Sequence, residues 1–348
     1  MNQPAELRAM VADLLARAAG IDARLAAITP CALGGNNRIY RVETTAGVFA
    51  AKQYFRHESD PRDRLAAEYA FLNYASAAAP GTTPRPFARS RELGMALYEF
   101  LDGRRFLPGE IGAAQVEAAI RFFRALNAPP MHGAAQLPVA SEACFSIADH
   151  LALIGGRINR LLEALPQSDL DAEALNFFRR LAEFWQQLSE SIRVDSSRAN
   201  LDVDTPLAPE HRCISPSDFG FHNALAEKDG NIRFLDFEYA GWDDPAKTAG
   251  DFFAQLAVPV STDFFGHFVT QILKDFPDAE RLSFRARLLR PAYQIKWCCI
   301  ALNVFLPVHL ARRAFANPSL DEIALKRAQL LKANQILNSI ETNTHGLH

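Results

Sequence analysis

The sequence predicts an α+β protein in two lobes, a small β-rich lobe followed by a large, mostly helical lobe. Within residues 25–101, short apolar runs have the length and composition of strands, at 39–42, 48–54 and 93–100. After residue 104, apolar residues recur mainly at helical spacing. The pattern changes at Leu101-Asp102-Gly103, which reads as a linker. We therefore expect lobes of residues 1–101 and 102–348.

The N-terminal lobe is expected to hold two helices beside its strands. Residues 5–19 mix charged and apolar residues at helical spacing and predict an amphipathic helix. Ala46-Gly47 predicts the turn between the first two strands. Asp60 and Pro61 predict a second helix, with Asp60 as its N-cap and an end near Ala77.

The C-terminal lobe shows six helical patterns, at 111–127, 143–164, 170–193, 262–275, 283–313 and 319–340. Ser319 and Glu322 have the spacing of a capping box for the last helix. Residues 199–209 lack periodicity and predict a loop. The longest apolar stretch, Trp297–Leu310, is too short to span a bilayer and contains Pro307, so we expect a buried, proline-bent helix and no membrane insertion.

Composition limits the function classes. The 348 residues are 49% hydrophobic and 22% charged, with a net charge of −3. These values are ordinary for a globular protein, and they lack the basic excess expected for nucleic-acid binding. The five cysteines have no metal-ligand spacing and predict reduced thiols in a cytoplasmic protein. The oligomeric state stays open.

Two segments carry the candidate chemistry. Residues 215–223, Ser-Pro-Ser-Asp-Phe-Gly-Phe-His-Asn, place Asp218 five positions before Asn223, and Asp236 closes the apolar strand 232–236. A strand-turn-strand arrangement would bring these oxygen ligands to one end. Transfer of the γ-phosphoryl group of ATP needs such a set, since one carboxylate accepts the hydroxyl proton while an amide oxygen and a second carboxylate hold Mg²⁺. Asp and Asn are also common turn residues, so either segment alone predicts little.

Lys52 and Glu68 extend this site into the first lobe. Lys52 is expected to share a strand face with Val48 and Ala50 and to point inward, where it needs an anion. Ala50 would then cover the adenine of the nucleotide, and Lys52 would reach its α- and β-phosphates. Glu68 lies on an apolar helix face, so Lys52 is its expected partner, with Arg64 as the surface alternative.

Two further segments are candidates for nucleotide contacts by position. Gly34, Gly35 and Asn36 lie ahead of Lys52, where small residues would let backbone N–H groups approach phosphate oxygens, although Gly-Gly-Asn is also an ordinary hairpin turn. Glu99 and Leu101 lie where the lobes join, and their backbone groups are expected to read the adenine edge.

From about Leu33 to Arg313 the chain resembles the aminoglycoside phosphotransferase and choline kinase-like family, small-molecule kinases with the two-lobed protein-kinase-like fold. The resemblance is sharpest at the Asp218-x-x-x-x-Asn223 spacing and in residues 235–241, Leu-Asp-Phe-Glu-Tyr-Ala-Gly, followed by Asp244-Pro245 and Asp251-Phe252-Phe253. It implies Asp218 as the catalytic base, Asn223 and Asp236 as Mg²⁺ ligands, and Lys52 with Glu68 as the phosphate-binding ion pair.

One position departs from the family pattern. The family usually has His two positions before the catalytic Asp, where this chain has Pro216. A proline can rigidify the turn instead, so we expect an active, ATP- and Mg²⁺-dependent kinase of a small-molecule hydroxyl. A nucleotide-binding pseudokinase acting as regulator or scaffold is the alternative that Pro216 suggests. A protein kinase is disfavoured, because no Ala-Pro-Glu element follows Asp236.

The substrate is expected to lie against the helical lobe. From Asp251 to His348 there are 11 Lys or Arg and 8 Asp or Glu residues, which is unlike the acidic pocket that a polycationic aminoglycoside needs. A small cation such as an amino alcohol could lie near Glu238, Asp243 and Trp297. A sugar or sugar-like alcohol fits equally, by stacking on Trp297, although Trp297 could also be plain core.

Overall fold

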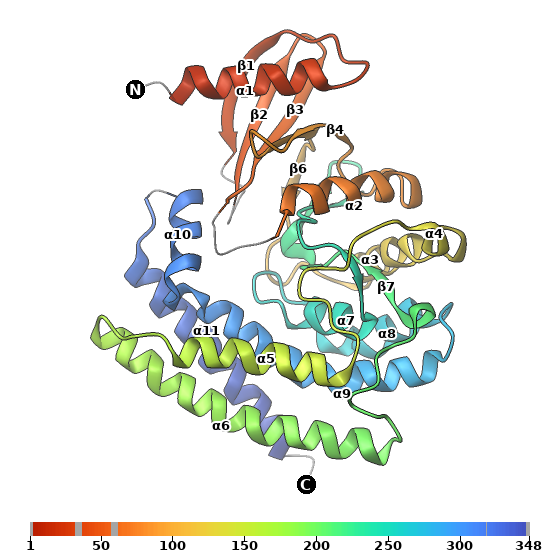
Figure 1. The fold of residues 1–348 in the computed structure, drawn as a ribbon, viewed down its shortest axis with the longest axis vertical. Helices are drawn as coiled ribbons and strands as arrows, with labels where there is room; N and C mark the ends of the chain where they lie inside the picture. The colour runs from red at the N-terminus through yellow and green to blue at the C-terminus, as the bar shows by residue number, and fades with distance from the viewer. Residues whose placement is uncertain (1–2, 32–36, 57–61, 318, 346–348) are drawn as a thin grey trace.

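The computed structural model describes residues 3–31, 37–56, 62–317 and 319–345. A small lobe with a five-stranded sheet stands above a large helical lobe (Figure 1), which confirms the predicted two-lobed α+β architecture. The antiparallel sheet has the order β1-β2-β3-β5-β4. Its strands are β1 (Leu25–Cys31), β2 (Arg38–Thr44), β3 (Gly47–Gln53), β4 (Pro86–Ser90) and β5 (Met95–Glu99).

The two helices of the small lobe have different positions relative to the sheet. Helix α1 (Gln3–Arg17) covers one face, where Val11 and Leu14 pack with Phe49 and Ala51 of β3. Helix α2 (Arg64–Ala78) lies between the sheet and the large lobe (Figure 1). Its N-cap is Asp63, whose side chain accepts from the backbone of Ala66. The helix therefore begins later than predicted; Asp60 and Pro61 lie outside the described residues.

Two small sheets connect the lobes and carry the loops of interest. β6 (Gly103–Arg105) pairs with β8 (Ala224–Glu227), which pairs with β9 (Ile232–Phe234). β7 (Cys213–Ser215) pairs with β10 (Gly241–Asp243). Gly103, predicted as linker, thus lies in a strand, because the chain entering the large lobe pairs with a strand more than 100 residues ahead.

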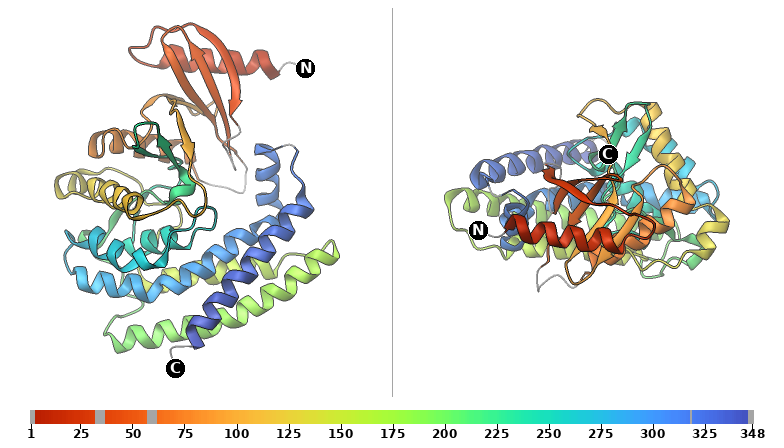
Figure 2. Two further views of the ribbon diagram at one scale, coloured as in Figure 1. Left: turned by 180° about the vertical axis from the view of Figure 1, so that it is seen from behind. Right: turned by 90° about the horizontal axis from the view of Figure 1, so that it is seen from above.

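The large lobe contains α3 (Ala113–Leu126), α4 (Pro129–Ala134), α5 (Ile147–Leu162), α6 (Asp169–Arg198), α7 (Pro245–Ala254), α8 (Phe265–Leu273), α9 (Ala279–Leu302), α10 (Pro307–Ala316) and α11 (Glu322–His345). Short 3₁₀ turns lie at Pro209–His211, Phe221–Asn223, Thr262–Phe264 and Asn303–Phe305. Seen from behind, the long helices α6, α9 and α11 lie together at the base of the molecule (Figure 2).

The structure corrects the helices predicted for the large lobe. The pattern at 283–313 predicted one helix, but it forms α9 and α10, bent by 75° where Pro307 starts the second helix. Helix α11 starts after Asp321, which accepts from the backbone of Ala324, so Ser319 is not its cap. Helix α7 was not predicted, because all ten of its residues are buried and none presents a solvent-exposed polar face.

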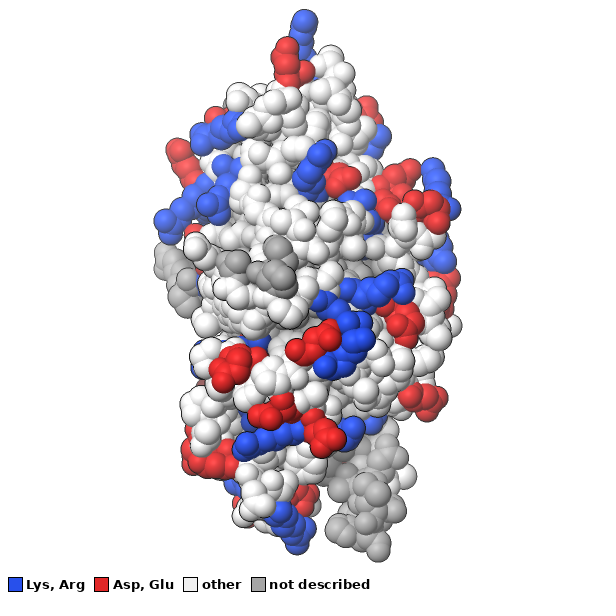
Figure 3. All heavy atoms as spheres, turned by 90° about the vertical axis from the view of Figure 1, so that its right-hand side faces the viewer, with Lys and Arg blue, Asp and Glu red and all other residues white. Residues whose placement is uncertain are grey.

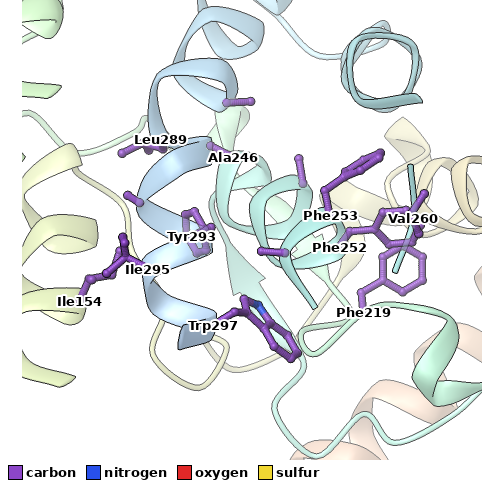
Figure 4. Packing of buried hydrophobic residues seen from close by; sticks show 14 of the residues in the cluster. Ile154, Phe219, Ala246, Phe252, Phe253, Val260, Leu289, Tyr293, Ile295 and Trp297 are labelled. Atoms are coloured by element: carbon purple, nitrogen blue, oxygen red, sulfur yellow. The ribbon is translucent and has the colours of Figure 1, made fainter. Parts of the chain in front are cut away.

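Helix α9 runs through the core of the large lobe. Tyr293 is fully buried against α7, and a Cβ added at Gly250 would lie 2.4 Å from its ring. Phe252 of α7 packs on Phe219 of the candidate catalytic loop, with ring centres 5.1 Å apart (Figure 4). The core thus supports that loop from below.

Among the described residues, no single helix is long and apolar enough to cross a membrane. Ala279–Phe305 and Pro307–Phe315 pass that test only as a bent pair. On the face shown in Figure 3, acidic and basic side chains are interspersed.

Candidate active site

The loop after β7 presents Asp218 at the junction of the lobes. Ser217 and Asp218 have φ values of 46° and 45°, in the left-handed region that costs non-glycine residues energy. Asp236, after β9, has a φ of 65°. Three residues with strained backbone therefore lie in the two segments that carry the candidate chemistry in the sequence. Phe219 and Phe221, buried on either side of Gly220, anchor the loop in the core.

Two neighbours fix the carboxylate of Asp218. His222 Nε2 lies 3.1 Å from Oδ1, and the amide nitrogen of Asn223 donates to Oδ2 at 3.1 Å and also to the backbone carbonyl of Asp218. Desolvation raises the pKa of Asp218, but the charge and hydrogen bond of His222 and the hydrogen bond of Asn223 outweigh it and lower the pKa below its ordinary value. The side chain is 32% exposed. It is an ionised carboxylate that an incoming group can reach.

Lys52 is buried at the centre of a charged cluster. Its Nζ lies 2.7 Å from Glu68 Oε2 and 2.5 Å from Asp236 Oδ1, so the Glu68 pairing predicted from sequence is present. Burial would lower the pKa of Lys52, but the charges of Asp236, Glu68 and Glu238 raise it well above its ordinary value. The expectation that Lys52 lies on an apolar strand face was wrong in part. Val48 on the same face is 37% exposed, and the carboxylates rather than apolar neighbours enclose Lys52.

Hydrogen bonds from other elements fix the carboxylate of Glu68 beside Lys52. The hydroxyl of Tyr54 donates to Glu68 Oε2 at 2.6 Å and lies 2.6 Å from the hydroxyl of Tyr98. The backbone N–H of Phe237, next to Asp236, donates to Glu68 Oε1 at 3.3 Å. Helix α2 is thereby connected to the segment after β9 that carries Asp236.

Asp236 of this cluster and the neighbouring Asn223 carry oxygen atoms that could hold a divalent cation. Desolvation and the charges of Glu238 and Glu68 raise the pKa of Asp236 to about 6, despite Lys52. A divalent cation bound beside Asp236 would favour the ionised form of this carboxylate. Asn223 donates through its amide nitrogen, so its amide oxygen is oriented away from Asp218 and could act as a ligand. Carboxylate and amide oxygens are the ligands that Mg²⁺ prefers.

The other predicted nucleotide contacts are placed only in part. Ala50 is half-buried on the same face of β3 as Lys52. The backbone N–H of Glu99 donates to the carbonyl of Arg85, so this donor is already engaged, and Leu101 follows at the lobe junction. Gly34, Gly35 and Asn36 lie outside the described residues.

A cavity of about 920 Å³ opens beside Asp218, on the side of the large lobe. Residues of α5, α9 and α10 form much of its wall. Trp297 of α9 lines it, and its indole N–H donates to Asp251 Oδ1 at 2.8 Å. Lys296 donates to both oxygens of Asp251, also at 2.8 Å. A hydroxyl compound bound there would meet the Asp218 carboxylate.

Residues 27–284 match the model of the phosphotransferase enzyme family. The chain belongs to this family. The resemblance drawn from the motifs is thereby confirmed, and so is the expectation of an enzyme, a phosphotransferase. No curated protein matches the phosphotransferase by sequence.

Solved structures have a fold similar to that of the phosphotransferase over nearly its whole length. A choline kinase from Cryptosporidium parvum has a TM-score of 0.61 at 11% identity, covering 97% of both chains. A choline/ethanolamine kinase family protein from Mesorhizobium loti has a TM-score of 0.58 at 15% identity, covering 96% of this chain and 94% of its own. A spectinomycin phosphotransferase in complex with ADP and spectinomycin has a TM-score of 0.55 at 10% identity, covering 93% and 97%. At these identities the likeness shows the fold.

Two of the three residues predicted to bind substrate have other tasks in this phosphotransferase. Glu238 is buried between the lobes, where Arg64 and Asn37 donate to its two oxygens at 3.0 and 2.8 Å. Asp243 is fully buried and accepts from the backbone of Cys144 and from Lys247 Nζ, at 3.1 and 2.5 Å. Neither lines the cavity. Trp297 does.

Sequence reasoning missed two residues near the chemistry. His222 is in the motif itself, one residue before Asn223, but a lone His gives no signal until its ring is placed against Asp218. Asp251 follows Lys247 at i+4 on α7 and is paired with Lys296 of α9. That second partner comes from a helix 45 residues away and could not be predicted from spacing.

Proposed function

We propose that this phosphotransferase moves the γ-phosphoryl group of ATP to a hydroxyl group of a small molecule, with Mg²⁺ and with Asp218 as general base. The observation that carries the proposal is the convergence of Lys52, Glu68 and Asp236 with Asp218 and Asn223 at one junction between the lobes. The related spectinomycin phosphotransferase crystallised with ADP supports nucleotide use.

Each residue has a defined task in this proposal. Lys52 binds the α- and β-phosphates, and Glu68 holds its ammonium group in place. Asn223 and Asp236 would hold Mg²⁺, which when bound neutralises charge on the phosphates. Ala50 and the backbone at Glu99 and Leu101 would contact the adenine.

The acceptor reaction is written around Asp218. The acceptor oxygen attacks the γ-phosphorus, the bond from that phosphorus to the β-bridging oxygen breaks, and ADP leaves. Asp218 takes the hydroxyl proton as this bond forms, because its lowered pKa keeps it ionised at neutral pH. His222 and Asn223 hold the carboxylate in position, so the loop is supported although Pro216 replaces the usual His.

Family membership and the intact base and metal ligands weigh against the pseudokinase alternative. The cavity also weighs against a cationic antibiotic as acceptor, because Lys296 and Trp297 already occupy Asp251. ATP use and five free cysteines agree with a cytoplasmic enzyme.

The test is ADP release by purified protein with a panel of sugars, amino alcohols, hydroxy acids and nucleosides. Asp218→Asn should keep ATP binding and the melting temperature, and should lose transfer by about 10²-fold or more. Addition of a chelator should abolish transfer, and Mg²⁺ should restore it. Full activity of Asp218→Asn would contradict the role of the base, and no ADP above the variant's background with any acceptor would favour the pseudokinase.

A further inference from the structure

The acceptor cavity carries more positive than negative charge. Seven Lys or Arg side chains and four Asp or Glu side chains line it. The basic ones are Arg62, Arg157, Arg160, Lys247, Lys296, Arg312 and Arg313, and the acidic ones are Glu142, Glu163, Asp218 and Asp251. This excess of positive charge is larger for a ligand than the count suggests, because most of the acidic side chains are already paired within the protein.

The carboxylates of the cavity are largely engaged. Both oxygens of Asp251 accept from Lys296, and Trp297 donates to one of them. Glu142 pairs with Arg157. Asp218 serves the reaction in the proposed function. Glu163 is left at the exposed rim, one turn from Arg160 on α5. A cationic acceptor would find few available carboxylates here.

Arginines from two helices face the cavity without carboxylate partners. Arg160 lies near the end of α5 and Arg313 on α10, and across the described residues neither has an ion pair. Burial, and then the neighbouring charge of Arg312, lowers the pKa of Arg313. Burial together with the charges of Arg312, Arg157, Arg160 and Arg62 lowers the pKa of His309 in the same wall to about 4. The guanidinium charges of α5 and α10 therefore act on one space.

The aromatic side chains of the cavity are unsuited to an ammonium group. The ring of Tyr239 already faces Arg62 and Arg64, with guanidinium carbons 5.4 and 5.2 Å from its centre. Trp297 meets the ring of His222 edge-on, with centroids 5.9 Å apart. Arginines of the protein therefore hold the positions that a substrate cation would need against Tyr239.

We propose that the acceptor of this phosphotransferase carries an anionic group, a carboxylate or a phosphate, besides the hydroxyl that is phosphorylated, and that Arg160 and Arg313 bind this group. Guanidinium groups bind carboxylate and phosphate through paired hydrogen bonds, and a partly buried anion would compensate their charge. The inference rests on the proposed function. The reaction itself is unchanged: the hydroxyl proton goes to Asp218, ADP leaves, and the product has two anionic groups.

The experiment compares matched acceptors that differ in one group. Glucose, glucosamine, glucuronate and glucose 6-phosphate supply neutral, cationic, carboxylate and phosphate forms of one scaffold, and glycerol, glycerate and glycerol 3-phosphate repeat the series on a smaller one. We expect kcat/KM to be at least about 10-fold higher for an anionic member than for the neutral and cationic ones. The uronate and phosphate arms decide which anion is bound. A preference for the neutral or cationic members would overturn the proposal.

Two variants test the site directly. Arg160→Gln and Arg313→Gln should each raise the KM for the preferred anionic acceptor by about 10-fold and leave the KM for ATP unchanged. Arg179→Gln, an exposed arginine of α6 outside the cavity, is the matched control and should have no effect. Unchanged acceptor KM in both cavity variants would contradict the assignment.

A binding measurement separates failure of this inference from failure of the proposed function. Asp218→Asn with Mg²⁺ and a non-hydrolysable ATP analogue is titrated calorimetrically with glucuronate, glucose 6-phosphate and the two glycerol-derived anions. One outcome is that no acceptor is phosphorylated but one of the four anions binds to Asp218→Asn. If adding Arg160→Gln and Arg313→Gln to Asp218→Asn then abolishes that binding, the anion site is supported and the proposed phosphotransfer reaction is not. If none binds and none is phosphorylated, the anion site is wrong.

Discussion

At the residue scale, the carboxylate of Asp218 depends on its neighbours for position. Its left-handed backbone is strained, and hydrogen bonds from Asn223 and His222 keep the side chain pointing across the loop. A Cβ at Gly220 would lie 2.8 Å from His222 Nδ1, so a glycine there makes room for the ring. His222 is thus a positioning residue, absent from the sequence predictions.

We expect His222→Ala to lower kcat by about 10-fold with little change in the KM for ATP, because Asp218 loses one partner while the Lys52 cluster is untouched. Steady-state kinetics with the best acceptor measures kcat and the KM for ATP separately. His267→Ala is the control, since His267 is exposed on α8 and pairs with Glu117 far from the loop. Equal loss in both variants, or a change confined to the ATP KM, would remove His222 from this role.

The motif residues were predictable because their spacing is local. Asp218, Asn223 and Asp236 lie within 19 positions, so a strand-turn-strand unit brings them together whatever surrounds it. Glu238 and Asp243 lie in the same stretch, yet sequence placed them with the substrate. Their buried partners, Arg64 and Lys247, come from other elements and decide their tasks.

At the scale of elements, the contact between α7 and α9 supports the site from below. Gly250 of α7 lets the ring of Tyr293 approach its backbone, and α7 carries Asp251 while α9 carries Lys296 and Trp297. Helix α7 escaped prediction because it is buried all round. Its formation depends on packing more than on an amphipathic pattern.

Gly250→Ala should lower the free energy of unfolding by about 1–3 kcal/mol, because the new methyl group would overlap Tyr293 in a packed core. Urea denaturation measures the change. Gly266→Ala is the matched control: Gly266 is an exposed helical glycine of α8 with nothing within 4 Å of the added Cβ, so alanine should be neutral or stabilise by about 0.5–1 kcal/mol. Equal effects at the two sites would contradict the packing argument.

A buried histidine makes the stability of the large lobe pH-dependent. His150 of α5 lies 3.0 Å from Asp244 Oδ2 and next to the hydroxyl of Tyr293, with Arg285 and Asp243 also nearby. Burial lowers its pKa below the ordinary 6.5, and Asp244 opposes this only in part. Below pH 6.5 the unfolded chain binds a proton that the folded protein resists, so stability is full above 6.5 and falls as the pH drops.

The contribution of His150 to the free energy of unfolding should therefore decrease between pH 7 and pH 5, by up to about 1.4 kcal/mol per pH unit. Urea titrations at several pH values give the slope. His150→Gln should flatten it, whereas His267→Gln at an exposed position should not. An identical pH slope in wild type and His150→Gln would show that His150 titrates normally.

At the scale of the whole molecule, Glu238 connects the lobes. It follows Asp236 in the large lobe and receives Arg64 and Asn37 from the small one, while Phe237 stacks on Phe71 of α2 with ring centroids 4.5 Å apart. This junction sets the position of α2, and so of Glu68 and Lys52, relative to Asp218.

Glu238→Gln should raise the KM for ATP several-fold and lower the free energy of unfolding by about 3 kcal/mol, because a buried ion pair loses its charge. The KM for the acceptor should not change, which separates this task from the substrate contact first predicted. Glu43→Gln, in the exposed pair with Arg41, is the control and should alter neither value. An effect on the acceptor KM alone would support the sequence-based prediction that Glu238 contacts the substrate.

The sequence by itself determined the two-lobed α+β class, the phosphotransferase family and the set of candidate groups, because periodicity, turn residues and short spacings are local properties of the chain. Tertiary structure decided which groups share a space. Lys52 meets Asp236 across 184 positions, Glu238 joins two lobes, and arginines of α5 and α10 meet around one cavity. The charge of that cavity, and hence the acceptor we infer, follows from packing between distant elements, which no local pattern encodes.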